Sequence, residues 1–303
     1  EAFATYSEAI ACEHGIGTIS QLEWLNIKIQ QVTQQHDGSV YVEDISTVPN
    51  IFDYRLTYAK SALVLHSLRW EIGDEAFFQA IKNYLNDPML ADNFATTDDL
   101  KAHFEAACEC SLSGFFNDWI YGEGHPNYTV YWKQDEQNRM SVRIDQAPSH
   151  SSVNFFEMHV PIRFVGGTVD TLMAFDHQYT GQLFEFQLDG RVSRIDFDPE
   201  RKLITPQPVI YRIDTFYNNN KILIAPNPAT EKIVVITGIG SSFAWVELFD
   251  IHGHIVKSIT CEQQQQKLEI DVTDIPAGIY ILKIKENDQQ IFVKKMVKAP
   301  QKR

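Results

Sequence analysis

The sequence predicts a multidomain α+β protein with a helical N-terminal part, a β-sandwich after it and a smaller β-sandwich near the C-terminal end. Apolar residues recur at spacings of three and four over residues 1–123, which is typical of helices. They alternate with polar residues over 124–206 and again over 224–298, which is typical of strands. The segment 207–223 contains the polar run Asn218–Asn220, and we expect it to be a linker.

The helical part contains several start and stop signals. A helix is expected to run from about Leu56 towards Gly73, a residue suited to ending it, and another is expected to start at Asp74. Thr96–Asp99 fits a capping box, in which the first and last side chains bond to each other's backbone N–H. A last short helix is expected over residues 115–120, before a glycine-containing segment ends it.

The first β part shows period-two alternation at 128–132, 142–144, 158–164, 183–186 and 192–197. Short strands at this spacing, separated by Gly, Asp and Asn, indicate an antiparallel sandwich. The second β part is expected to contain strands at 233–236, 244–249, 254–258, 267–270, 279–284 and 290–296. The glutamine run Gln263–Gln266 lies between two of these strands and is expected to be a solvated loop.

Charge and hydropathy exclude two classes of partner. The net charge is -14, and an acidic surface repels phosphate backbones, so no nucleic-acid partner is expected. No apolar run approaches the about 18 residues that a membrane helix needs, so no membrane span is expected either.

The four cysteines are Cys12, Cys108, Cys110 and Cys261. Cys108 and Cys110 are so close in sequence that we do not expect them to pair with each other. Four cysteines over this length do not form a disulfide framework, and they leave the redox compartment open.

None of the ten histidines belongs to a His-Glu-x-x-His motif or to its inverted form. His252 and His254 flank Gly253 in an expected turn, where histidines are more often surface residues than metal ligands. His66 lies in an otherwise apolar helix and is interpreted as a core or groove residue, and His125 is interpreted as structural.

The first eight residues, Glu-Ala-Phe-Ala-Thr-Tyr-Ser-Glu, resemble a segment of the alanyl-aminopeptidase-type gluzincins. In that family the segment follows the zinc-binding helix and usually reads Asn-Glu-Gly-Phe-Ala-x-Tyr, so Ala2 replaces the commoner Gly. Four further pieces follow in the family's order, and Ser61 again departs from Gly. These pieces are Tyr58–Ala62, Leu68–Phe77, Ala95–Leu100 and Phe115–Ile120. The resemblance spans residues 1–127 and implies the helical half of a thermolysin-like catalytic domain.

The resemblance implies a zinc aminopeptidase that removes N-terminal residues from peptide substrates. Catalytic zinc takes three protein ligands and keeps one position open for water. Glu1 matches the family's carboxylate ligand, and Tyr58 matches the tyrosine whose hydroxyl donates to the oxyanion of the tetrahedral intermediate. Tyr54, one turn earlier, is a rival for the role of that tyrosine. Glu8 lies two helical turns after Glu1 and is interpreted either as a residue that orients a ligand or as part of an ion pair.

The two zinc histidines, the general-base glutamate and the acidic motif that binds the substrate's amine are absent from the sequence. A single carboxylate does not hold zinc at useful affinity. We therefore expect the chain to be a fragment that is inactive alone. The alternative is a non-catalytic secreted protein that keeps a degenerate peptidase scaffold for binding, and a weaker one is a carbohydrate-binding array that uses aromatic residues such as Trp132 and Tyr179.

The last part resembles the type A sorting domain of the type IX secretion system. The resemblance rests on Ala225–Ala229, Val246–Gly253, Ile270–Val272, Ile275–Tyr280 and Lys294–Lys298. It implies export across the outer membrane of a Gram-negative bacterium, with the secretion machinery as a partner and a secreted or cell-surface location. The basic tail has two interpretations. The secretion machinery recognises it, or it is an ordinary terminus that keeps the protein soluble. That tail comprises Lys294, Lys295, Lys298, Lys302 and Arg303.

Overall fold

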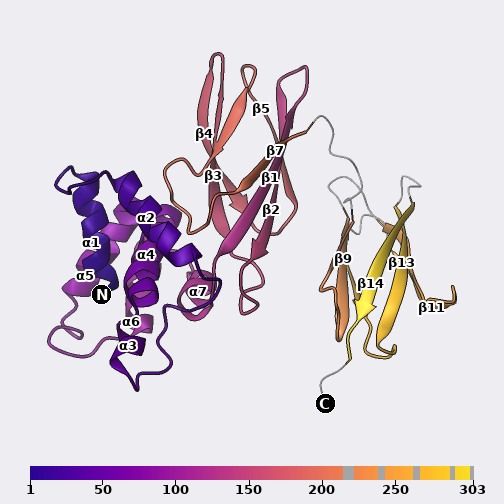
Figure 1. The fold of residues 1–303 in the computed structure, drawn as a ribbon, viewed down its shortest axis with the longest axis horizontal. Coiled ribbons are helices and arrows are strands. Elements are labelled where there is room, and N and C mark those ends of the chain that lie inside the picture. Colours follow the sequence, from indigo (N-terminus) through magenta and orange to yellow (C-terminus); the bar gives the residue numbers. More distant parts are fainter. Residues whose placement is uncertain (214–221, 238–242, 262–266, 287–290, 301–303) are drawn as a thin grey trace. The chain divides into compact units, whose positions relative to one another are not determined.

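The computed structural model divides into two compact units, an N-terminal unit (Glu1–Asp214) and a C-terminal unit (Thr215–Arg303). Figure 1 shows helices in the first part of the N-terminal unit and strands in the rest of the chain. The structure describes all residues except 214–221, 238–242, 262–266, 287–290 and 301–303. Asn218–Asn220, Gln263–Gln266 and the last two basic residues, Lys302 and Arg303, therefore lie outside the described residues.

The helical part consists of α-helices and two π-helices. In chain order they are α1 (Ala2–Glu13), α2 (Gln21–Thr33), α3 (Val48–Ile51), η1 (Tyr54–Lys60), α4 (Ser61–Ile72), α5 (Asp74–Leu85), α6 (Thr97–Cys108), α7 (Ser113–Phe116) and η2 (Asn117–Tyr121). No helix among the described residues is both long enough and apolar enough to cross a membrane.

Local signals in the sequence set several of these helix ends. Gly73 ends α4 at a φ of +81°, a conformation that residues with a side chain rarely adopt, and α5 begins at Asp74 as predicted. The capping box is confirmed, since the Asp99 N–H donates to Thr96 Oγ1 at 3.3 Å and the Thr96 N–H donates to Asp99 Oδ2 at 2.8 Å. The helix expected from Leu56 differs in its first turns, which are π-helical, because side-chain spacing does not separate a π-turn from an α-turn.

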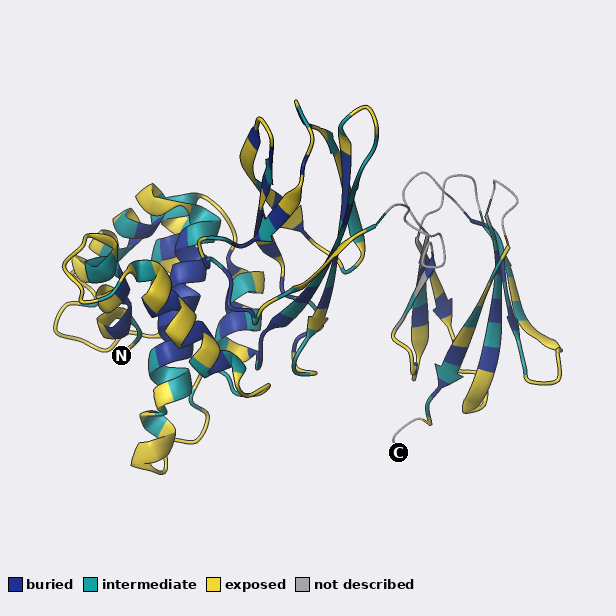
Figure 2. Ribbon diagram, turned by 45° about the horizontal axis from the view of Figure 1, so that its top comes forward, coloured by how far each residue is buried: buried dark blue, intermediate teal, exposed yellow. Residues whose placement is uncertain are grey.

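α4 is the central helix of this part. It contacts α1, α2, α5, η1 and η2. Nine of its twelve residues are buried (Figure 2), because a helix that is covered on all sides has no face left for solvent. The helices around it therefore take their positions from one apolar centre.

Two sheets complete the N-terminal unit. Their strands are β1 (Pro126–Gln134), β2 (Arg139–Pro148), β3 (Met158–Gly166), β4 (Val169–His177), β5 (Gln182–Gln187), β6 (Arg194–Phe197) and β7 (Val209–Arg212). One sheet has the order β5-β2-β1-β7 and the other the order β4-β3-β6. All pairs are antiparallel except β1 with β7, which is parallel.

Two of these strands were not expected from the sequence. β4 exposes most of its residues and so lacks a clear apolar alternation. β7 lies inside the segment expected to be a linker, and all four of its residues are exposed because it forms the edge of its sheet. Edge strands carry a weak hydrophobic pattern since neither of their faces has to be buried.

The helices and sheets of the N-terminal unit share a single buried core. The Trp119 ring of η2 lies 4.4 Å from the Phe156 ring, measured between centroids. Trp70 Nε1 of α4 donates to the carbonyl oxygen of His159 in β3 at 2.7 Å, and Ser67 Oγ donates to the carbonyl oxygen of Lys202 at 2.8 Å. Trp132 is only 3% exposed, so its ring packs inside the core and does not present a surface for glycan binding.

The C-terminal unit has its own core and two sheets. Its strands are β8 (Ile222–Ala225), β9 (Lys232–Thr237), β10 (Phe243–Phe249), β11 (Ile255–Thr260), β12 (Lys267–Asp271), β13 (Gly278–Glu286) and β14 (Ile291–Lys298). The sheets have the orders β11-β10-β13-β14 and β12-β9-β8. Val246 and Leu248 of β10 lie opposite Ile284 and Leu282 of β13, and all four are buried.

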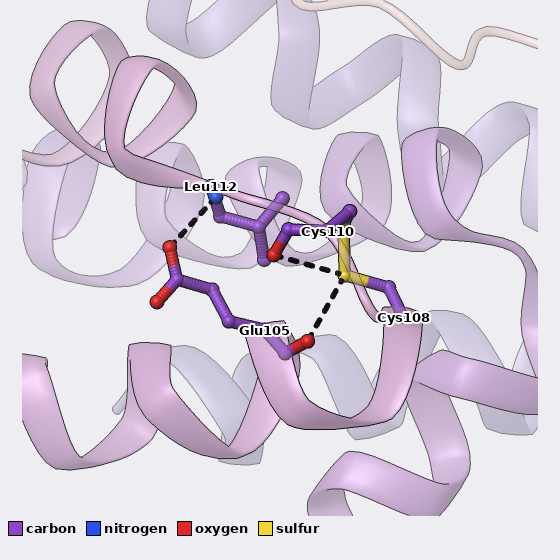
Figure 3. The surroundings of a disulfide bond; sticks show 4 residues. All are labelled: Glu105, Cys108, Cys110 and Leu112. Carbon is purple, nitrogen blue, oxygen red and sulfur yellow. Dashed lines mark hydrogen bonds between the residues drawn. A yellow bond between two sulfur atoms is a disulfide. The ribbon is translucent and has the colours of Figure 1, made fainter.

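A disulfide between Cys108 and Cys110 corrects the expectation that these residues would not pair (Figure 3). Glu109 between them ends α6 in the left-handed conformation, with φ 54° and ψ 34°, and this turn brings the two Cα atoms to 5.2 Å. That separation lies within the range a disulfide spans. The Leu112 N–H donates to Glu105 Oε1 at 2.8 Å and fixes the chain after the bridge.

The disulfide predicts the number of reactive thiols. Cys12 and Cys261 are free, so we expect two of the four cysteines to react with iodoacetamide when the protein is unfolded without reductant. Mass spectrometry of the alkylated protein measures this number, and prior reduction is the control that should make all four available. Four labels without reductant would show that the bridge does not form.

Candidate active site

Glu1 stands at the N-terminal end of α1. Its carbonyl oxygen accepts the first helical hydrogen bond, from the Thr5 N–H at 2.9 Å, while its side chain does not cap the helix. The residue is exposed. Glu1 therefore presents its carboxyl oxygens at the surface, at the end of the helix where the dipole favours negative charge.

Tyr58 lies within the π-helix η1. Asp53 caps this helix, because its Oδ1 accepts the N–H groups of Arg55 and Leu56 at 2.8 and 2.7 Å. At the other end Ser61 Oγ donates to the carbonyl oxygen of Tyr58 at 3.1 Å. Short π-helical turns are frequent at functional sites, since the extra residue re-aims a side chain.

The structure brings Glu1 and Tyr58 together although they are far apart in sequence. α1 packs against η1. The pKa of Tyr58 is raised, first by partial loss of hydration and then by the negative charge of the nearby Glu1 carboxylate. The Tyr58 hydroxyl therefore remains a proton donor at neutral pH, beside a carboxylate.

Tyr58 contacts Tyr54, which in turn lies beside the buried Lys28. The Tyr54 ring stacks on the Tyr58 ring with centroids 5.9 Å apart. Lys28 Nζ of α2 lies 5.2 Å from the Tyr54 ring centroid and 5.4 Å from that of Trp24. This arrangement places Tyr54, the rival phenol, as a stacking neighbour of Tyr58.

Glu8 of α1 contacts Trp24 of α2. Trp24 Nε1 donates to Glu8 Oε2 at 3.1 Å, and Trp24 is buried while Glu8 is exposed. This hydrogen bond joins α1 to α2. It explains the acidic residue at this position by helix packing, and the role of orienting a metal ligand stays a prediction.

A polar network of hydrogen bonds joins side chains of α1 to side chains of α4. Tyr6 Oη lies 3.1 Å from His66 Nδ1, and the guanidinium of Arg69 donates to both carboxylate oxygens of Glu13 at 2.7 and 2.9 Å. Arg69 also donates twice to Asp74, at 2.8 Å each. His66 is 3% exposed, so the interpretation as a core residue is confirmed, and burial lowers its pKa to about 3. The network fixes α1, which begins at Glu1, against the helix that continues from Tyr58.

The network predicts how stability depends on pH. Hydrogen bonds from Arg69 hold the pKa values of Glu13 and Asp74 below their usual values. Their stabilising contribution is therefore present above the unfolded pKa of about 4 and is lost as the pH falls through the folded pKa. We expect Arg69→Met to lower the free energy of unfolding by about 2 kcal/mol at pH 7, less than for a fully buried pair because both carboxylates are partly exposed.

Urea titrations at neutral and acid pH, followed by tryptophan fluorescence, measure this difference. The difference in the free energy of unfolding between wild type and Arg69→Met should narrow as the pH falls below about 4 and should vanish once the pH is below the lowered folded pKa values of Glu13 and Asp74. The matched control is Arg163→Met, since Arg163 pairs with Asp170 on an exposed surface and should matter little. A gap that is constant with pH would show that Arg69 stabilises the fold by packing alone.

Lys60 is a further buried residue that sequence reasoning did not interpret. It is 1% exposed, and its Nζ donates to the carbonyl oxygens of Gly38 and Gly122 at 2.7 and 3.5 Å. Burial, followed by the nearby charge of Arg55, lowers the pKa of Lys60 to about 8. Lys60 thus connects the loops that contain Gly38 and Gly122 to η1, the helix that contains Tyr58. The only sequence signal for this role is its position two residues after Tyr58 in the Tyr-x-Lys piece.

An apolar cavity of about 290 Å³ lies next to this site. Ala2 and Phe3, which directly follow Glu1, line it together with Val64 and Leu65 of α4. Phe104 of α6 forms part of its far wall. Neither Glu1 nor Tyr58 lines the cavity, and its apolar lining can accept an apolar group.

Comparisons with known families agree with these observations. Residues 1–119 match the family described as "Peptidase family M1 domain", and residues 223–299 match the "Secretion system C-terminal sorting domain". The N-terminal part of the chain is thus similar to M1 peptidases, and the C-terminal part is similar to secretion sorting domains. Both family resemblances predicted from the sequence are thereby confirmed.

Two curated relatives align with part of the chain. Probable aminopeptidase 1 of Sulfurisphaera tokodaii is 23% identical over 163 residues, which are 54% of this chain and 18% of the relative. Aminopeptidase N of Lactobacillus helveticus is 22% identical over 102 residues, which are 34% of this chain and 12% of the relative. The chain thus spans less than a fifth of the length of either relative.

A solved structure of Legionella pneumophila aminopeptidase A in complex with aspartic acid is also similar to the chain. It is 14% identical, covers 72% of this chain with 25% of its own length, and has a TM-score of 0.46.

The M1 family implies a zinc ion, and the residues of this chain meet that requirement in part. Glu1 offers one exposed oxygen ligand beside a phenol donor, which is the carboxylate share of a site with two histidines and one carboxylate. Within the described parts of the chain, a metal-sized group of three such ligands occurs at Asp250, His252 and His254 in the C-terminal unit.

Proposed function

We propose that residues 1–123 form part of the catalytic domain of a secreted zinc aminopeptidase that hydrolyses N-terminal residues from peptides. The observation that carries this proposal is that α1, which begins after Glu1, packs against η1, which contains Tyr58, and that the charge of Glu1 raises the pKa of the Tyr58 phenol. By the resemblance of the sequence motifs, Glu1 would correspond to the family's carboxylate zinc ligand and Tyr58 to its oxyanion donor, and the helices that carry them pack together although the residues are far apart in sequence.

In this proposal each residue has a separate task. Bound zinc supplies a Lewis acid that polarises the peptide carbonyl and acidifies a water molecule. Glu1 would contribute one ligand, and this sequence contains no His-Glu-x-x-His motif to supply the others. The Tyr58 hydroxyl donates a hydrogen bond to the oxyanion, and its raised pKa keeps it protonated for that purpose.

The domain assignment belongs to the same proposal. We assign residues 1–123 to the helical half of a thermolysin-like domain and residues 124–206 to a β-sandwich that braces it. The core that passes from Trp119 to Phe156 supports this bracing role. Residues 207–223, which include strand β7 of the first sandwich, would then lead to a small sandwich at 224–298 that carries the sorting signal.

The activity is tested with two forms of the protein. The chain of 303 residues, supplied with zinc and an aminoacyl anilide, should give no turnover, because a single carboxylate does not hold the metal. A longer gene product with a His-Glu-x-x-His motif upstream of Glu1 should hydrolyse the same substrate. If the gene encodes no such motif there, the chain is instead a non-catalytic binding protein on a degenerate scaffold. Turnover by the 303-residue chain would refute the assignment of roles.

The export step is tested separately. The sorting-domain match supports export to the cell surface or medium of a Gram-negative bacterium. In a bacterium that has the type IX machinery, the full chain should reach the outside, and a chain that ends before residue 224 should stay in the periplasm. Equal export of both forms would contradict this assignment.

A further inference from the structure

A tight turn between β10 and β11 places one aspartate, Asp250, beside two histidines, His252 and His254. Asp250 Oδ1 accepts the backbone N–H groups of His252 and His254 at 2.8 and 2.9 Å. The Asp250 N–H donates to the His254 carbonyl oxygen at 3.0 Å, and Gly253, with φ +85°, donates its N–H to the Asp250 carbonyl oxygen at 3.1 Å. The first two hydrogen bonds orient the carboxylate and the other two close the turn, so the carboxylate is fixed before any ligand arrives.

The same turn brings possible metal-ligand atoms of Asp250, His252 and His254 close together. Asp250 Oδ2 lies 3.2 Å from His254 Nδ1 and 3.9 Å from His252 Nδ1, and possible ligand atoms of the three residues lie within 4.8 Å of one another. The two imidazole rings face each other at 29° with centroids 6.1 Å apart. Ligands at about 2.1 Å from a tetrahedral ion lie roughly 3.4 Å apart, so small side-chain rotations suffice.

We propose that Asp250, His252 and His254 bind one divalent transition-metal ion. Two imidazoles and one carboxylate suit Zn²⁺, Ni²⁺ or Cu²⁺ and are a poor set for Mg²⁺ or Ca²⁺, which prefer oxygen ligands. The site differs from the one at Glu1, because it lies in the other unit and needs no residue from it.

Two properties of the turn favour a metal over a plain ion pair. The side chains of His252 and His254 are 72% and 79% exposed, so an ion reaches them without any opening of the fold and keeps its remaining positions for water. Asp250 uses one oxygen to organise the backbone and presents the other to both rings, which is how a fixed carboxylate ligand is built.

Isothermal titration calorimetry of the whole chain with Zn²⁺ tests the proposal. We expect one ion to bind per chain, and His252→Gln and His254→Gln should each weaken binding by about tenfold or more. His14→Gln is the matched control, because His14 is exposed on the N-terminal unit and its loss should leave the affinity unchanged. Equal affinity of wild type and the double variant His252→Gln/His254→Gln would overturn the site.

Two further variants separate this site from other causes. Asp250→Asn keeps an oxygen that accepts the two backbone N–H groups, so the turn survives while the anionic ligand is lost, and zinc binding should weaken. Unchanged affinity in Asp250→Asn would remove the carboxylate from the ligand set and overturn the site as proposed. Glu1→Gln should not alter zinc binding by this chain, and a loss in that variant would assign the ion to Glu1 instead.

Discussion

Tyr58→Phe is expected to lower kcat by about 100- to 1,000-fold in a longer, active form of the protein that includes the upstream zinc ligands. The substitution removes only the phenol oxygen, which donates to the oxyanion as charge develops in the transition state. KM should change little, because the interaction is stronger in the transition state than in the bound substrate. Steady-state kinetics with an aminoacyl anilide measure both constants.

Tyr54→Phe is the matched control for this experiment. Tyr54 stacks on Tyr58 and sits beside Lys28, so the same chemical change is made one turn away in the same aromatic group. We expect its kcat to stay close to that of the unmodified enzyme. If Tyr54→Phe causes the large loss and Tyr58→Phe does not, the two phenols exchange roles.

Trp119→Ala is expected to lower the free energy of unfolding of the N-terminal unit by about 3–5 kcal/mol. Trp119 is 1% exposed and packs on Phe156, so its removal leaves a cavity where the helical and β parts meet. Urea titration followed by fluorescence measures the loss. Trp24, Trp70 and Trp132 remain as probes of this unit in the variant.

The control for Trp119→Ala is Phe94→Ala. Phe94 is 96% exposed, so the same truncation of an aromatic ring removes little buried area and should change stability by less than about 0.5 kcal/mol. A loss of similar size in both variants would mean that the transition does not report on the core around Trp119.

Local signals in the sequence were sufficient for the parts of the fold that local chemistry determines. Gly73 and the capping box at Thr96–Asp99 ended and began helices where predicted, because each acts through its own backbone. β7 was missed because its pairing with β1 is non-local and its residues face solvent. The Cys108–Cys110 bridge depends on the left-handed turn at Glu109, which spacing alone does not reveal.

In the candidate site too, the sequence indicated some residues, whereas their partners became visible only in the structure. Glu1 and Tyr58 were selected by family resemblance, since one carboxylate and one phenol carry no pattern of their own. The neighbouring residues Glu8 and Lys60 have partners in distant segments: Trp24 for Glu8, and Gly38 and Gly122 for Lys60. Such contacts join residues through packing, and no periodicity in the sequence marks them.

The shared core of the N-terminal unit decides how the protein can be divided for experiments. A cut after residue 123 would strip the covering from Trp119 and from the other apolar side chains that face the sheets. The isolated helices should therefore aggregate or be degraded by proteases, even though residues 1–119 match a family on their own. A shortened form that stays in solution has to include the strands as far as β7, which pairs with β1 at the edge of its sheet.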